Sequence, residues 1–354
     1  MSRKNTLEAI KDKIENSSDG YIYFDEFMEI ALYSAFGYFN SGEIKSTKRG
    51  DFLTSPEVSS YFGKIIHEWI VSVSTNETID LLELGPGSGS LANSINAEKE
   101  NKDINFSFLE KSESAISSLS KAFPQSDIKK SIDELSLSHS ENLIVIGNEI
   151  LDNIPCSIGV FMDSMWKEKA IAMNDRQLSY CFVEPRDNVM SWLNLHYKEE
   201  KPDYEVEVQI HAELFLSNII KKLNPSNIVI FDYGYLQDER PSKPYKSLLR
   251  TYKDHHLGPD PLLYPGETDI TYDINFSALL SVLEGIGGYD VEISSQYEFL
   301  YKHGLNKYIN ELIEKRPSQE GVDLVKTNSD LLGLATISDE NGLGGFYAIE
   351  STRK

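Results

Sequence analysis

The sequence predicts an α/β fold built on a largely parallel, doubly wound sheet. An apolar run from Ile79 to Leu84 passes through a glycine-rich turn into a helix start at Leu91. Strand, tight glycine turn and helix form the nucleotide-binding corner of such sheets. Further apolar runs of strand length follow along the chain and alternate with segments of helical spacing. These runs are 104–110, 143–148 and 227–234.

The glycine turn at residues 85–89 determines which ligand this corner is expected to hold. Glycines can take positive φ and let a ligand approach the backbone, while the helix start offers free N–H groups. A dinucleotide turn has the spacing Gly-x-Gly-x-x-Gly, but Ser90 stands at the sixth position here. The stretch from Glu83 to Gly89, Glu-Leu-Gly-Pro-Gly-Ser-Gly, instead resembles the first motif of class I methyltransferases, which bind S-adenosylmethionine. Glu110, about twenty residues beyond the turn, suits the ribose hydroxyls of either ligand.

Composition excludes several functional classes. The 354 residues carry a formal net charge of -22, so no cationic surplus can displace counterions and nucleic acid is not an expected partner. Cys156 and Cys181 have no paired spacing and no nearby histidine cluster, so no metal site is expected. No stretch approaches about 20 consecutive apolar residues, which argues against a membrane span. Residues 1–20 lack the composition of a signal or transit peptide, so we expect a cytoplasmic protein.

The N-terminal part of the chain is expected to be helical. Apolar residues recur at helical spacing over 7–14 and 24–33. Ser55 is a candidate cap for a third helix, with Pro56 at its first position and an end near Val73.

The polar, glycine-interrupted stretch 49–57 is expected to fold over the ligand as a lid, and a surface connection is the alternative. Thr54, Ser55 and Glu57 precede and begin the third helix. They are candidates either for ligand contact or for helix capping.

The remaining elements follow from periodicity and turn residues. Alternating segments joined by turn residues over 157–183 predict a small antiparallel meander, and 235–273 is expected to be a long irregular excursion. Helices are expected over 113–123, 205–223, 275–287 and 297–314, and strands over 127–130, 290–294 and 345–350.

Polar groups follow the strand that ends at Asn148. Open α/β sheets bind ligands at the carboxyl ends of their strands, where Asn148, Glu149 and Asp152 are expected. Glu149 and Asp152 could hold a cationic acceptor through charge-assisted hydrogen bonds. The alternative is that Glu149 caps the following helix turn and Asp152 lies on the surface.

Six motifs together resemble the MidA-like family, which includes the mitochondrial complex I assembly factor 7 proteins. The motifs occur in the family's order and cover nearly the whole chain. They are Gly37-Tyr38-Phe39, residues 50–57, residues 83–89, Asn148-Glu149 with Asp152 and Pro155, Asp232-Tyr233-Gly234, and Pro265-Gly266 with Asp269-Ile270-Thr271.

The resemblance implies a class I methyltransferase with a Rossmann-like seven-stranded sheet, whose final strand is antiparallel. An N-terminal helical extension and lid over 1–75 would precede a methyltransferase domain over 76–354, with insertions at about 156–204 and 235–274. S-adenosylmethionine would be the cofactor, with Glu149 and Asp152 as catalytic residues. Its expected contacts are Glu83, Gly85, Pro86, Gly87, Gly89, Glu110, Asn148, Thr54, Ser55 and Glu57.

The mitochondrial members imply that the substrate is an accessible arginine of a protein partner, such as a subunit of a respiratory complex. The chain departs from the family pattern at Ser88 and Ser90, where arginine and threonine are usual, and at Ile150 and Asn153. These departures leave the cofactor expectation intact and weaken the substrate expectation. A catalytically silent assembly chaperone and a small-molecule methyltransferase are the alternatives.

Overall fold

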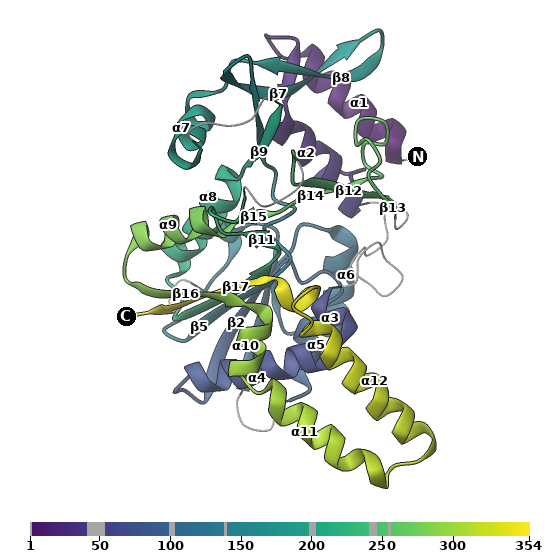
Figure 1. Cartoon of the computed structure of the whole chain (residues 1–354), viewed down its shortest axis with the longest axis vertical. Coiled ribbons are helices and arrows are strands. Elements are labelled where there is room, and N and C mark those ends of the chain that lie inside the picture. Colours follow the sequence, from purple (N-terminus) through teal and green to yellow (C-terminus); the bar gives the residue numbers. More distant parts are fainter. Residues whose placement is uncertain are drawn as a thin grey trace. The chain divides into compact units, whose positions relative to one another are not determined.

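The computed structural model describes residues 2–40, 54–98, 103–137, 140–197, 203–240, 246–253 and 256–354. The chain forms two compact units, each assembled from three segments (Figure 1). Residues 1–43, 151–218 and 234–286 make the small-sheet unit. Residues 44–150, 219–233 and 287–354 make the large-sheet unit.

A seven-stranded sheet organises the large-sheet unit, in the order β4-β3-β2-β5-β10-β17-β16. Strands β4, β3, β2, β5 and β10 run parallel to one another, and β17 is antiparallel to both of its neighbours. This confirms the expected sheet with an antiparallel final strand. The strands are β2 (Thr78–Leu84), β3 (Asp103–Leu109), β4 (Asp127–Lys129), β5 (Leu143–Asn148), β10 (Asn227–Asp232), β16 (Tyr289–Ser295) and β17 (Tyr347–Arg353).

The central strands are buried on both faces, which explains their continuous apolar runs. All six residues of β10 and the first five of β5 are buried. Parallel pairing aligns Glu83 with Ile146 and Asn148 with Phe231. The register therefore brings the carboxyl ends of β2, β5 and β10 to one edge of the sheet.

Helices of the large-sheet unit bury apolar faces in the same core as the sheet. In α4 (Ser60–Val73) the buried residues Phe62, Ile65, Ile66, Trp69 and Ile70 recur every three or four positions. The others are α3 (Ser55–Val58), α5 (Ser90–Asn96), α6 (Glu113–Ala122), α10 (Gln296–Lys302), α11 (Leu305–Lys315) and α12 (Gly321–Ile337). Helices α11 and α12 pack side by side (Figure 1).

Two expected helices are each divided in the structure. The helix expected from Pro56 to Val73 breaks at Ser59, whose extended backbone ends α3 and whose hydroxyl accepts the N–H of Tyr61 at 3.3 Å to cap α4. Thr54, not Ser55, is the N-cap residue of α3. The helix expected over 297–314 breaks at Gly304, which has a φ of 119°. Helix α12 was not expected from the sequence.

The small-sheet unit contains a five-stranded antiparallel sheet, in which β1, β7, β6 and β9 follow in order and β8 also pairs with β7. Strands β6, β7 and β8 pair in sequence and confirm the expected meander. The strands are β1 (Tyr21–Tyr23), β6 (Ser157–Met162), β7 (Met165–Asn174), β8 (Gln177–Val183) and β9 (Tyr204–Val208). The prediction of a helix over 205–223 is wrong for its first residues, which form β9 and pair with β6. Helix α8 (Ile210–Leu223) begins only after this strand.

The excursion over 235–273 is more regular than expected. It contributes a three-stranded sheet in the order β13-β12-β14, with Ile270 and Thr271 buried. The short strands are β11 (Gly234–Tyr235), β12 (Leu249–Lys253), β13 (His256–Leu257), β14 (Asp269–Tyr272) and β15 (Ile274–Asn275). The remaining helices of this unit are α1 (Ser2–Glu15), α2 (Phe24–Tyr33), α7 (Asp187–His196) and α9 (Phe276–Ile286). Across the described ranges, none of the helices has the length and apolar character needed to cross a bilayer.

Candidate functional site

The glycine turn connects β2 to α5 in the large-sheet unit. Gly85, Gly87 and Gly89 have φ angles of 60°, 52° and 77°, in the left-handed region that favours glycine. A Cβ on Gly85 would lie 2.5 Å from Cδ1 of Ile150, so the space beside the turn is also restricted. The N–H of Gly89 donates to the carbonyl of Pro86 at 2.8 Å. The structure therefore has the tight turn that the sequence predicts.

Glu83 lies near the end of β2 and is only 4% exposed. Its carboxyl group accepts the N–H of Ala92, but its Oε2 atom has no hydrogen-bond partner among the described residues. Burial, and then the charge of Glu110, raise the pKa of Glu83 to about 8. A buried acceptor left without a partner costs roughly 1–3 kcal/mol. The site is thus chemically suited to a ligand that supplies a donor or a positive charge.

Glu110 follows β3 and fixes the turn from the other side. One carboxylate oxygen accepts the N–H of Gly87 at 3.1 Å, and the other accepts the N–H of Ser112 at 2.8 Å. Burial raises the pKa of the Glu110 carboxyl, while these backbone donors oppose the shift. The acid expected to meet a ribose therefore also orients the turn.

Glu57 joins the turn to helix α3. Its Oε1 atom accepts hydrogen bonds from the hydroxyls of Ser88 and Ser90, the latter at 2.6 Å. The two hydroxyls lie 2.9 Å apart. In the sequence alone, these serines stand out only as departures from the family pattern. No local pattern pairs them with an acid more than thirty positions earlier, which only the tertiary fold brings close.

Ser55 is placed differently from Glu57, although both are in α3. It is fully buried, and its hydroxyl donates to Oε1 of Gln296 at 3.1 Å. Nε2 of Gln296 in turn donates to the carbonyl of Ile337 at 2.7 Å. These contacts join α3 to α10 and the end of α12. Thr54 precedes α3 as its N-cap residue, and residues 49–53 of the expected lid lie outside the described residues.

Glu149 follows β5 with a backbone conformation that is unusual for a residue with a side chain. Its φ is 51°, and its N–H donates to the carbonyl of Phe231 at 2.8 Å. Nδ2 of Asn148 donates to Oε1 of Glu149 at 3.2 Å, while Oδ1 of Asn148 is buried without a partner among the described residues. Such backbone strain, of order 1–3 kcal/mol, concentrates at functional sites. No helix begins over 149–156, so Glu149 does not cap one.

Asp152 lies in the small-sheet unit and is 4% exposed, so the alternative of a surface position is wrong. Its Oδ2 accepts the hydroxyl of Thr271 at 2.6 Å, and its carbonyl accepts the N–H of Tyr272 at 3.3 Å. The neighbouring Asn153 donates from Nδ2 to Oδ1 of Asp269 at 3.0 Å. Two motifs that are distant in sequence therefore meet at β14.

The structure brings some of the expected residues together and separates others. Glu83, Glu110, Glu57, Asn148 and the glycine turn belong to the large-sheet unit, as does Glu149. Asp152 is held with Thr271 in the small-sheet unit. Among the described residues, no cluster of three histidine, cysteine or acidic side chains could hold a metal ion.

A family model described as an S-adenosyl-L-methionine-dependent methyltransferase matches residues 62–294. Curated relatives named protein arginine methyltransferase NDUFAF7, mitochondrial, or its homolog, match over most of the chain. The relative from Drosophila melanogaster is 26% identical, and the match covers 76% of this chain and 68% of the relative. The relative from Caenorhabditis elegans is 24% identical, and the match covers 91% of this chain and 82% of the relative. The relative from Homo sapiens is 24% identical, and the match covers 84% of this chain and 73% of the relative. These matches confirm the resemblance drawn from the motifs and the expected cofactor.

Two crystal structures from Burkholderia thailandensis share the fold. One, described as a candidate methyl transferase bound to S-adenosyl-homocysteine, has a TM-score of 0.85 at 22% identity, covering 99% of this chain and 92% of that one. The other is described as a native crystal structure, and it has a TM-score of 0.83 with the same identity and coverage. Both confirm the expected class I methyltransferase fold.

The expectation of a cytoplasmic location is wrong. The curated relatives are named as mitochondrial proteins. The expectation rested only on the composition of residues 1–20, which does not determine where a protein works.

Proposed function

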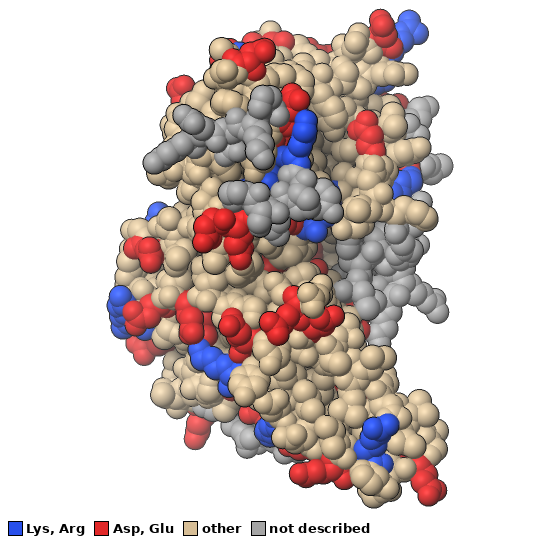
Figure 2. Space-filling model, in the orientation of Figure 1, with Lys and Arg blue, Asp and Glu red and all other residues tan. Residues whose placement is uncertain are grey.

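Because the chain belongs to the MidA-like family of S-adenosylmethionine-dependent methyltransferases, we propose that it methylates an arginine side chain of a protein partner. The names of the curated relatives support this substrate. The net charge of -22 favours a basic segment of the partner, since opposite charges accelerate encounter. Figure 2 shows acidic side chains spread over the visible face, with basic ones isolated between them. A subunit of a respiratory complex is the partner that the relationship suggests.

The partnerless Oε2 atom of Glu83 is the observation that carries the cofactor site. Bound S-adenosylmethionine supplies a methyl group on a sulfonium, together with an amino acid end and an adenosine end. Glu83 would pair with the ammonium of the amino acid end, which would give its buried carboxylate a positively charged partner. Glu110 would accept the ribose hydroxyls, and the turn from Gly85 through Pro86 to Gly89 would let the ligand approach the backbone.

The other proposed cofactor residues differ in how they act. Asn148 offers its partnerless Oδ1 at the carboxyl end of β5, and Thr54 offers its hydroxyl ahead of α3. Glu57 positions the turn through the two serine hydroxyls. Ser55 positions α3 through Gln296.

Glu149 is the residue proposed to hold the arginine. The cofactor would supply its methyl group to a guanidinium nitrogen of the substrate, and that nitrogen would then lose one proton. The chain must therefore align the acceptor and take that proton. The carboxylate of Glu149 can bind the guanidinium through two charge-assisted hydrogen bonds and accept the proton. Asp152 is proposed as the second carboxylate, with its orientation fixed by Thr271.

The test uses S-adenosylmethionine with a labelled methyl group and a soluble extract of the host. The wild-type enzyme is expected to label arginine in a protein. Glu149→Gln keeps the shape of the side chain and removes its charge, so labelling should fall by about 10²-fold or more while S-adenosyl-homocysteine binding persists. Glu141→Gln removes an exposed acid at the other end of β5 and should leave labelling unchanged.

Label on a lysine, a carboxylate or a small molecule would overturn the arginine assignment. Full activity of Glu149→Gln would overturn the role of Glu149. An absence of all transfer despite cofactor binding would favour the assembly chaperone.

A further inference from the structure

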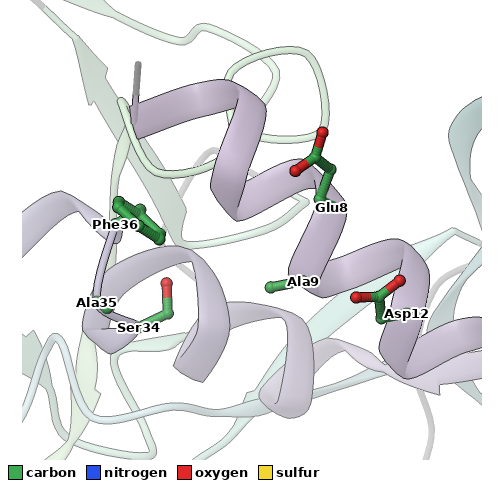
Figure 3. Close-up of a pocket in the computed structure, with 6 residues that line it drawn as sticks. All are labelled: Glu8, Ala9, Asp12, Ser34, Ala35 and Phe36. Carbon is green, nitrogen blue, oxygen red and sulfur yellow. The ribbon is translucent and has the colours of Figure 1, made fainter.

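A groove in the small-sheet unit lies between helix α1 and the segment that follows helix α2 (Figure 3). Its volume is about 440 Å³, large enough for a side chain of a partner protein. None of its lining residues is a candidate for the cofactor or catalytic site. They are Glu8, Ala9, Asp12, Ser34, Ala35 and Phe36.

One wall of the groove carries two carboxylates that form no salt bridge with the residues that the structure describes. Glu8 and Asp12 lie one turn apart on α1, and both are exposed. No salt bridge joins either of them to another described residue, whereas Lys13 on the same helix pairs with Glu26 at 3.3 Å. Like charges four positions apart on a helix repel each other. The helix therefore keeps a mildly unfavourable pair of charges at the groove.

The other wall offers an aromatic face and a hydroxyl. The side chain of Phe36 is 46% exposed, and aromatic faces attract guanidinium and ammonium groups. The Oγ atom of Ser34 is buried and has no partner among the described residues, and Figure 3 shows it directed toward α1. This wall thus adds an apolar surface and an unused acceptor.

The two walls are held together before any ligand arrives. The hydroxyl of Thr6, on α1, donates to the carbonyl of Phe36 at 2.8 Å. A Cβ on Gly266 would lie 2.4 Å from Oγ1 of Thr6 and 2.8 Å from that carbonyl, so the Gly266 loop packs closely against this joint. A preformed groove loses little conformational entropy on binding.

We propose that this groove binds an arginine side chain in a basic segment of the protein substrate, at a position other than the methylated arginine. The proposal rests on the proposed function. A planar guanidinium can bridge the carboxylates of Glu8 and Asp12, stack on Phe36 and donate to Ser34 at once. The ammonium of lysine is a compact, strongly hydrated charge and cannot stack in this way. The groove is therefore expected to prefer arginine.

The probe is a fluorescent Gly/Arg peptide, compared with the same peptide carrying citrulline in place of arginine. Fluorescence anisotropy should show that the full-length protein binds the arginine peptide more tightly than the citrulline or lysine versions. Glu8→Gln with Asp12→Asn should weaken binding by about tenfold or more, because hydrogen bonds to charged groups are lost. Phe36→Leu should weaken it less.

The matched control, Glu15→Gln with Asp19→Asn, removes two exposed acids near the same helix but outside the groove and should change affinity by less than about twofold. Loss of binding through misfolding would lower Tm. The groove variant should instead keep or slightly raise Tm, since a like-charge repulsion is relieved.

The proposal is overturned if the groove variant binds the arginine peptide like the wild type, or if the control variant loses as much affinity. Equal binding of the citrulline or lysine peptide also overturns it. Methyl transfer separates this proposal from the proposed function. If the groove variant labels arginine with an unchanged KM, the proposed role of the groove is wrong and the proposed function stands. If the groove binds the arginine peptide but the enzyme labels no arginine, the proposed function is wrong and the role of the groove stands.

Discussion

Glu83 in the large-sheet unit and Asp25 in the small-sheet unit are equally buried, each 4% exposed, but their surroundings differ. Oδ2 of Asp25 accepts hydrogen bonds from Nη2 of Arg186 at 2.9 Å and lies 3.0 Å from Nε2 of His211. Burial acts to raise the pKa of Asp25, but His211 and Arg186 together hold it below its ordinary value. Burial raises the pKa of Glu83 to about 8, and no cation among the described residues opposes this shift.

The difference distinguishes a structural charge from a proposed binding site. Arg186 also bonds to the fully buried Glu168 and to the hydroxyl of Ser157, so this network is complete within the protein. Glu83 lies beside the glycine turn with one oxygen unused. A buried acid without a partner among the described residues, next to backbone shaped for a ligand, supports the proposal that the cofactor binds there.

The largest expected effect comes from breaking the complete network. Arg186→Leu removes the guanidinium that Asp25 and the fully buried Glu168 share, so the free energy of unfolding should fall by about 3–5 kcal/mol in urea denaturation. Arg316→Leu, at an exposed position, serves as the control. A loss below about 1 kcal/mol would show that the Arg186 network is not a structural centre.

The two acids should give pH dependences of opposite sign. Between about pH 4.3, the ordinary value for glutamate, and pH 8, folded Glu83 holds a proton that the unfolded chain releases, so stability falls as pH rises. The pKa of Asp25 is lowered, so its contribution is instead lost as pH falls below about 3.9.

Urea denaturation from pH 5 to pH 8 measures the Glu83 effect. The free energy of unfolding of wild type relative to Glu83→Gln should fall by about 3–4 kcal/mol over this range. Parallel profiles for the two proteins would show that Glu83 titrates normally.

Cofactor affinity should depend on Glu83 more than stability does. Glu83→Gln keeps the side-chain shape and removes the charge, so S-adenosyl-homocysteine binding should weaken by about tenfold or more in calorimetry. The cofactor-free protein should be no less stable at pH 7. Glu77→Gln, at an exposed position just before β2, should bind normally, and equal losses in both variants would contradict a specific role.

The smallest effect is expected where the turn meets α3. Ser90→Ala removes one hydrogen bond to Glu57, so the free energy of unfolding should fall by about 1 kcal/mol. Cofactor affinity should change by less than about threefold, because Ser88 still holds Glu57. A larger loss of affinity would mean that Ser90 contacts the cofactor directly.

The strands of the large sheet were predictable because two-sided burial leaves continuous apolar runs, as in β5 and β10. The glycine turn was predictable because its backbone conformation restricts the residue type. Strand β9 was missed because its short alternating run precedes helix α8 directly, and β12 because Arg250, Thr251 and Lys253 resemble a polar loop.

Contacts between distant segments could not be predicted. Ser55 meets Gln296 across 241 positions, and Glu57 meets Ser88 across 31. Nothing in the local pattern indicates either pairing, and both depend on how the helices pack. The spacing around the glycine turn is enough to single out Glu83 and Glu110 as candidates. That Oε2 of Glu83 has no partner among the described residues is visible only in the fold.

In the proposed site, Oε2 of Glu83 pairs with the positively charged ammonium of the cofactor. Glu83 is largely protonated at pH 7 in the free protein, because its pKa is about 8, and pairing with an ammonium should deprotonate it. Calorimetry of S-adenosyl-homocysteine binding at pH 7, in two buffers of different ionisation enthalpy, measures the protons released. We expect about one proton per cofactor for the wild type and none for Glu83→Gln. Equal proton release by the two proteins, or none by the wild type, would contradict the account.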